Sequence, residues 1–98
     1  MTLARLRVRR QEILRIASKH GARNVRVFGS VARGDADCRS DVDLLVDIEA
    51  DVKGLAYFGL VEELRRALST SLGQPVDIVD FAALNRLREP VLRDAVDL

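Results

Sequence analysis

The segment from Asp41 to Ile48 alternates between two kinds of residue, and this pattern constrains the fold more than any other part of the chain. Every second position is apolar, and the positions between carry three aspartates and a leucine. The apolar set is Val42, Leu44, Val46 and Ile48, and the other set is Asp41, Asp43, Leu45 and Asp47. Because successive side chains of a strand point to opposite faces, the pattern predicts a strand with one apolar and one acidic face.

Helical and strand patterns alternate along the rest of the chain. The predicted helices run from about Thr2 to His20 and from near Leu55 to Leu72, the other predicted strands are Val25–Phe28 and Val76–Val79, and a loop is expected from Gly34 to Ser40. Gly21 is expected to end the first helix, and Gly73 with Pro75 the second. This alternation favours an α/β layer structure, although strand direction cannot be predicted from it.

The segment from Phe81 to the C-terminus has only weak helical periodicity. Pro90 either interrupts a helix there or stands in the first turn of a final helix.

The length of the chain fits a single domain over residues 1–98, too small to hold a separate substrate-recognition domain. No apolar run approaches the roughly 20 residues that span a bilayer, and the Arg-rich N-terminus has no signal-peptide pattern. The one cysteine, Cys38, cannot form an internal disulfide, and the sequence places no His or other basic partner where it would activate this thiol as a nucleophile. These features indicate the cytoplasm and exclude a membrane protein.

Acidic residues are concentrated in the middle of the chain. Seven carboxylates lie between Asp35 and Asp51, although the net charge is only +1. Asp41 and Asp43 are predicted to leave the same strand face with Cα atoms roughly 6.5 to 7 Å apart. Carboxylates held this close repel each other unless a cation lies between them, and hard oxygen ligands suit magnesium or manganese. The alternative is a solvated edge strand with incidental acids.

Gly29 and Ser30 stand where a strand meets a turn, ten residues before the acidic pair. Glycine permits close approach of the backbone, and backbone N–H groups with the serine hydroxyl can hold phosphate oxygens. Ser30 is also a candidate N-cap of a brief helical turn, a role compatible with phosphate binding. Arg33 is a candidate phosphate ligand, and its alternative partners are Asp35 and Asp37.

Asp77 is the expected third carboxylate of a metal and phosphate site. It lies between Val76 and Ile78 in a short strand and is predicted to face away from them, where it can bind a metal and accept a proton from an attacking hydroxyl. The alternative to Asp77 is Asp80, which does not fit the alternation. A plain surface role for Asp77 also stays open.

Gly29-Ser30, ten residues and then Asp41-Val42-Asp43 resemble the signature of the DNA polymerase β-like nucleotidyltransferases. Arg33-Gly34 and the later strand around Asp77 are similar to the minimal nucleotidyltransferase group of that superfamily. The resemblance covers roughly residues 24–79.

The resemblance implies a mixed sheet flanked by helices, ATP as nucleotide donor, two magnesium ions and metal ligation by Asp41, Asp43 and Asp77. It also implies a protein partner, because members of the group are commonly antitoxins that adenylylate a tyrosine of a HEPN-domain RNase toxin. A homodimer or a mixed complex with the toxin is compatible with it. The alternatives are an antitoxin that acts by binding alone, and a free-standing nucleotidyltransferase acting on a small molecule or an RNA end.

The N-terminal arginines are expected to form a solvated helix face rather than a nucleic-acid site, because no aromatic residues interleave with them. They are Arg5, Arg7, Arg9, Arg10 and Arg15. His20, next to Gly21, is expected to interact with the dipole at a helix C-terminus.

Overall fold

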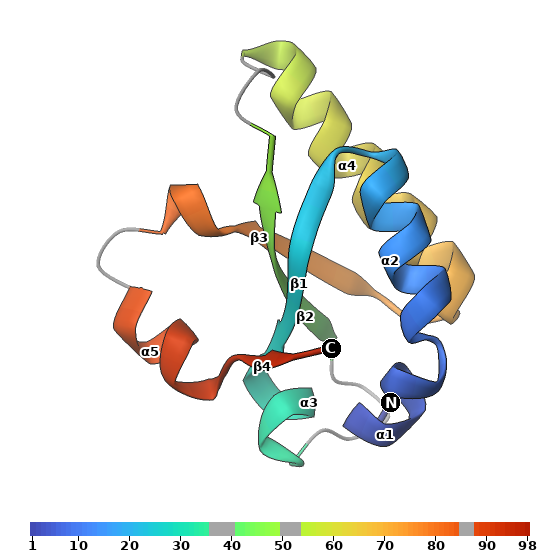
Figure 1. The fold of residues 1–98 in the computed structure, drawn as a ribbon, viewed down its shortest axis with the longest axis vertical. Coiled ribbons are helices and arrows are strands. Elements are labelled where there is room, and N and C mark those ends of the chain that lie inside the picture. Colours follow the sequence, from blue (N-terminus) through green and yellow to red (C-terminus); the bar gives the residue numbers. More distant parts are fainter. Residues whose placement is uncertain (36–40, 50–53, 85–87) are drawn as a thin grey trace.

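The computed structural model describes residues 1–35, 41–49, 54–84 and 88–98, with the backbone alone for 88–90. The elements in chain order are α1 (Leu3–Val8), α2 (Arg10–Lys19), β1 (Ala22–Phe28), α3 (Gly29–Arg33), β2 (Val42–Ile48), α4 (Leu55–Leu72), β3 (Val76–Asp80), the 3₁₀-helix η1 (Phe81–Ala83), α5 (Arg88–Asp94) and β4 (Val96–Asp97). The four strands form one sheet in the order β3-β2-β1-β4 (Figure 1).

The sheet is mixed, as expected. β1 pairs antiparallel with both β2 and β4, whereas β2 and β3 are parallel. Parallel neighbours need a long crossover connection, and α4 is part of the segment that provides it. In the parallel register Asp43 lies opposite Asp77, so the strand pairing itself sets these two acids side by side.

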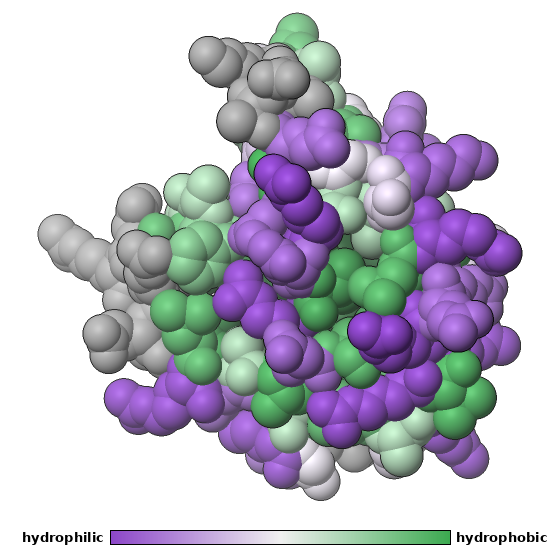
Figure 2. Space-filling view, viewed as in Figure 1, coloured by the Kyte–Doolittle hydropathy of each residue, from purple (hydrophilic) through white to green (hydrophobic). Residues whose placement is uncertain are grey.

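One face of the sheet is covered by α2 and α4, and the main core lies between these helices and the strands (Figure 1). The predicted apolar face of β2 is confirmed, because Val42, Leu44 and Val46 are fully buried. Outside this core the visible surface is mostly hydrophilic, with small apolar patches between the polar side chains (Figure 2). None of the described helices is long and apolar enough to cross a membrane.

Helix α4 has the predicted boundaries. Leu64, Leu68 and Leu72 recur every fourth residue and are buried, which places one stripe of the helix against the sheet. Gly73 ends the helix in the left-handed conformation with φ of 67°, a conformation that side chains disfavour.

The predicted helix from Thr2 to His20 is wrong in one respect, because it is broken at Arg9 into α1 and α2. The Thr2 hydroxyl caps α1 by accepting from the Arg5 N–H, and the chain then turns at Arg9. The turn brings the N-terminus against α3, where Leu3 and Val31 line a common pocket. Burial of apolar side chains against α3 thus outweighs the small helix propensity that favours one straight helix.

The C-terminal segment also differs from the prediction. It contains η1, then α5, and finally β4, a strand that the sequence did not indicate. Pro90 lies in the first turn of α5, which confirms the second of the two roles predicted for it. Two residues are too few to show an alternating pattern, so β4 is specified by its pairing with β1 rather than by its own sequence. The strand predicted at Val25–Phe28 begins earlier, at Ala22, and its register shifts between Arg23 and Arg26.

The second face of the sheet is covered only in part, by α3, η1 and α5. Leu45 points to this face and is nevertheless fully buried. Asp43, on the same face, stays partly accessible. The candidate site lies on this half-covered face.

Candidate active site

The site is built around the junction between β1 and α3. β1 ends at Phe28, directly opposite Asp43 of β2, and α3 begins at the next residue, Gly29. Gly29 has φ of 71°, and a Cβ placed there would overlap the Asp43 carboxylate and come within 3.2 Å of its Cγ. Glycine is therefore required at this position both by the backbone conformation and by the close approach of the acid.

The acids of the predicted metal site are placed by β2 and β3. Asp43 and Asp77 are register partners in the parallel pair, so their Cα atoms lie side by side at the spacing of adjacent strands. Asp41 is exposed and lies one residue before β2 begins, so it is not part of the regular strand. Asp77 is exposed on the side away from Val76, as predicted.

The pKa of Asp43 is raised above its usual value. Burial is the largest cause, followed by the negative charges of Asp77 and Asp41, while Arg33 acts in the opposite direction. The folded chain therefore holds a partly desolvated carboxylate among like charges, an arrangement that a cation would relieve.

Among the described residues, no three His, Cys, Asp or Glu side chains converge closely enough to enclose an ion. The strand register brings Asp43 and Asp77 together, and Asp41 acts on Asp43 through its charge. Carboxylate oxygens with excess negative charge are nevertheless the donor set that magnesium prefers. The donors thus fit a divalent metal, and ligation by all three acids stays a prediction.

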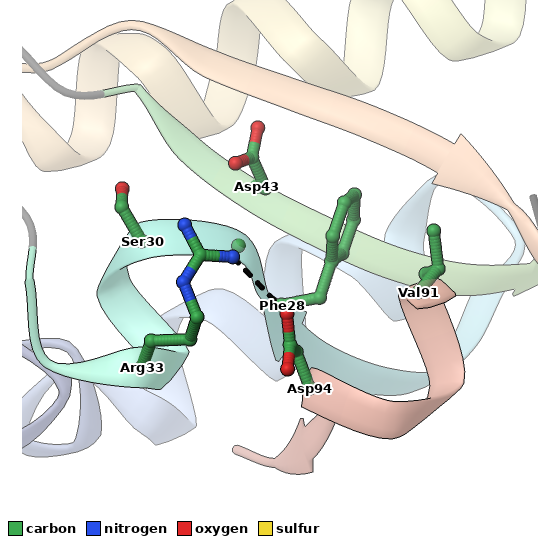
Figure 3. Close-up of a pocket in the computed structure, with 7 residues that line it drawn as sticks. Phe28, Ser30, Arg33, Asp43, Val91 and Asp94 are labelled. Atoms are coloured by element: carbon green, nitrogen blue, oxygen red, sulfur yellow. Dashed lines mark hydrogen bonds and ion pairs between the residues drawn. The ribbon is translucent and has the colours of Figure 1, made fainter. Parts of the chain in front are cut away.

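A cavity of about 390 Å³ opens beside Asp43 (Figure 3). Its lining residues are Phe28, Gly29, Ser30, Arg33, Asp43, Val91 and Asp94. Ser30 does not cap α3 as expected, because the N-cap residue is Phe28 and no side chain bonds to the N-terminus of that helix. Ser30 is instead one of the residues that line the cavity.

Arg33 reaches across this cavity toward Asp43 (Figure 3). Its Nε donates to Asp35 at 3.2 Å and its Nη1 to Asp94 at 3.0 Å. The pKa of Arg33 is raised, first by the hydrogen bond to Asp94 and then by Asp35. The pairing with Asp35, one of the alternatives to a phosphate role, is present, and Asp37 lies outside the described residues. A phosphate role for Arg33 stays a prediction.

Asp94 and Val91 of α5 are site residues that the sequence did not indicate. They belong to the segment of weak periodicity, and no spacing rule connects Arg33 with a residue 61 positions later. The one available signal was the acid itself, in a segment rich in charged residues. Only the packing of α5 against α3 and β1 brings it to the cavity.

Asp80, the alternative to Asp77, is engaged elsewhere. It accepts from the Tyr57 hydroxyl at 2.7 Å and caps η1 through the Ala82 N–H. It therefore ties α4 to the end of β3.

Two further predictions concern residues away from the cavity. The predicted position of His20 at a helix C-terminus is confirmed, since its Nδ1 lies 2.9 Å from the Ile16 carbonyl oxygen. Cys38 lies outside the described residues.

Comparison of this chain with known proteins shows which family it belongs to. The family model for polymerase β nucleotidyltransferases matches residues 11–97. The chain belongs to the polymerase β nucleotidyltransferase family. The expected family and the mixed nucleotidyltransferase fold are thereby confirmed.

Within this family, the chain is similar to the following individual proteins. Protein adenylyltransferase MntA of Thermococcus cleftensis is 40% identical over 83% of this chain and 79% of its own length. A solved structure of a chain assigned as a minimal nucleotidyltransferase is 47% identical, with a TM-score of 0.83 over 100% of this chain and 97% of that one. The MNT antitoxin in complex with a tri-AMPylated Shewanella oneidensis HEPN toxin shares the fold, with a TM-score of 0.67, 20% identity and coverage of 93% and 69%.

Family membership gives the cavity a general chemistry. As a nucleotidyltransferase, the chain is an enzyme that takes a nucleotide as substrate.

Proposed function

We propose that this nucleotidyltransferase transfers AMP from ATP to a tyrosine hydroxyl of a HEPN-domain toxin and thereby acts as its antitoxin. The observation that carries the proposal is the close approach of the Gly29 backbone to the Asp43 carboxylate at the edge of an open cavity. This contact brings the turn that we propose binds phosphate next to the acid that we propose binds the metal, and transfer of a nucleotidyl group needs both.

In this proposal Asp41, Asp43 and Asp77 hold magnesium, while Gly29, Ser30 and Arg33 bind the phosphates of ATP. The raised pKa of Asp43 and its register with Asp77 support this assignment. Bound magnesium would supply positive charge to the phosphate oxygens. Arg33, already oriented toward Asp43, adds a second positive charge on the other side of the cavity.

The transfer step needs a base for the acceptor hydroxyl. The acceptor oxygen attacks the α-phosphorus of ATP, the bond to pyrophosphate breaks, and the hydroxyl proton passes to Asp77. Asp77 suits this role because it is exposed at the sheet surface and lies opposite Asp43.

A protein acceptor is favoured by the openness of the site and by the names of the relatives. The half-covered sheet face leaves the acids accessible to a large partner. One relative is named a protein adenylyltransferase, and a structural neighbour was solved with an AMPylated HEPN toxin.

The test is incubation of the purified chain with the product of the adjacent gene, ATP and magnesium, followed by intact mass measurement. The wild type is expected to add the mass of one or more AMP groups to the partner, and Asp43→Asn to add none. Asp97→Asn is the matched control, because it removes an aspartate of β4 outside the cavity lining and is expected to retain transfer.

A different result would favour the binding antitoxin. If the wild type silences the partner and forms a complex with it, but no mass is added, adenylyl transfer is not the mechanism. Modification of an RNA end or a small molecule in place of the partner would favour a free-standing nucleotidyltransferase.

A further inference from the structure

Arg33 lies between two carboxylates that use different nitrogens of its guanidinium group. Asp35, two residues away, accepts from Nε, and Asp94 of α5 accepts from Nη1. No other residue in the described part of the chain accepts a hydrogen bond from this guanidinium, so Nη2 has N–H groups left to donate. The side chain is thus anchored and still has donors for a ligand.

Asp94 differs from Asp35 in its place relative to the cavity. Asp94 and Val91 are three residues apart on α5, so they share one helix side, and both line the cavity (Figure 3). Asp35 is not among the lining residues. Helix α5 packs on α3 and β1, the two elements that meet at Gly29, so it can hold Asp94 in a fixed position there.

Stability alone is a weak reason for this ion pair. The Arg33 side chain is 48% exposed and that of Asp94 is 32% exposed, and pairs this accessible contribute little to folding. An arginine without its partner would however sample many rotamers in solvent, and a ligand would have to order it on binding. The Asp94 contact restricts that freedom before the ligand arrives.

We propose that Asp94 is a positioning residue of the nucleotide site: it holds Arg33 so that the free part of the guanidinium faces the Asp43 side of the cavity, ready for the phosphates. This inference rests on the proposed function, since it takes the ligand to be ATP. It makes α5, a C-terminal helix, part of the nucleotide site.

The opposite role for Asp94 is competition with phosphate for Arg33. The geometry favours positioning, because Asp94 occupies one nitrogen and an arginine can bind a carboxylate and a phosphate at once. The two roles predict opposite changes in affinity when Asp94 is replaced, so one titration distinguishes them.

The test is calorimetric titration of the full chain with ATP in the presence of magnesium. The four proteins are the wild type, Asp94→Asn, Arg33→Gln and the double variant. When Arg33 is present, Asp94→Asn is expected to weaken ATP binding about tenfold. In the Arg33→Gln background it is expected to leave the Kd for ATP unchanged, because Asp94 acts through Arg33. Asp97→Asn, which removes a charge of β4 that is not bonded to Arg33, is the control and is expected to leave the Kd unchanged. A melting curve of each variant verifies that it is folded.

Tighter binding by Asp94→Asn would overturn the inference in favour of competition. An equal loss in both backgrounds would overturn it in favour of a direct contact between Asp94 and the nucleotide. If the wild type binds ATP and the four-protein pattern is as expected, but no partner is adenylylated, the positioning role stands and the proposed function fails. If the wild type does not bind ATP, both are wrong.

Discussion

The site depends most on the pair Gly29 and Asp43, because the Asp43 carboxylate occupies the space that a side chain at position 29 would need. We expect Gly29→Ala to lower the free energy of unfolding by about 2 to 4 kcal/mol, the sum of left-handed backbone strain and displacement of the carboxylate. Urea denaturation measures this change.

Gly34→Ala is the matched control for that prediction. Gly34 also has a positive φ, of 82°, but nothing lies within 4 Å of a Cβ placed there. Its substitution should cost only the backbone strain, about 1 to 2 kcal/mol. If both variants lose the same free energy of unfolding, the Asp43 carboxylate moves away from the new Cβ at no cost.

The raised pKa of Asp43 predicts that Asp43→Asn stabilises the metal-free protein while removing transfer activity. Burial and the charges of Asp77 and Asp41 disfavour the ionised form in the folded state. A carboxylate whose folded pKa lies above its unfolded pKa destabilises the protein at high pH, and this penalty disappears below the unfolded value. Asp43→Asn should therefore raise Tm by a few degrees at pH 7, and the gain should vanish as the pH falls below about 4.

Asp47→Asn on the same strand face is the comparison for that measurement. Asp47 accepts from Asn24 at 2.6 Å and pairs with Arg26, so its charge is already compensated. Its replacement should not raise Tm. A similar gain at both positions would trace the effect to the overall charge of the chain instead of the environment of Asp43.

At the residue scale, local rules found most of the site. The alternation around Asp43 and the turn residue Gly29 each have a short-range physical signature, and the structure sets them side by side. Asp94 had no such signature, because its place depends on how α5 packs and not on its neighbours in sequence. Ser30 was a candidate N-cap of the helical turn, but Phe28 occupies the N-cap position of α3.

At the element scale, predictability followed length and periodicity. Helix α4 has five turns with one apolar stripe, and its boundaries were predicted correctly. The break at Arg9 and the short strand β4 were not, because tertiary contacts decide both. The sequence also did not predict that β2 and β3 pair in parallel, because strand direction depends on the tertiary fold.

Strand β4 leads to a prediction about the last residue of the chain. Leu98 follows β4 directly, is only 7% exposed and belongs to the core. Leu98→Ala should lower the free energy of unfolding by about 2 to 3 kcal/mol, since it leaves a cavity beside Val25. Val8→Ala, at a position 86% exposed, should change it by less than about 0.5 kcal/mol. Similar values for both would show that the C-terminal residue is not held in the core in solution.

At the scale of the whole molecule, the two faces of the sheet have separate roles. One face is closed by α2 and α4 and supplies the main core, while the other is partly open and carries the acids. The N- and C-terminal segments meet as well, because Arg7 donates to the Asp97 carbonyl at 2.9 Å. The family and fold class were predictable because a single acidic strand and one glycine turn are diagnostic, whereas the closure of the second face came from segments without a pattern.

Helix α4 connects the two parallel strands β2 and β3, so its length affects the register in which they pair. Eighteen residues of helix span roughly 27 Å. The leucine stripe fixes where this length begins and ends relative to the sheet. One residue added within the helix would turn everything after it by about 100° and, if β3 slipped by one position, send Asp77 to the closed face. The register that sets Asp43 beside Asp77 therefore depends on the length of α4 as well as on the two strands themselves.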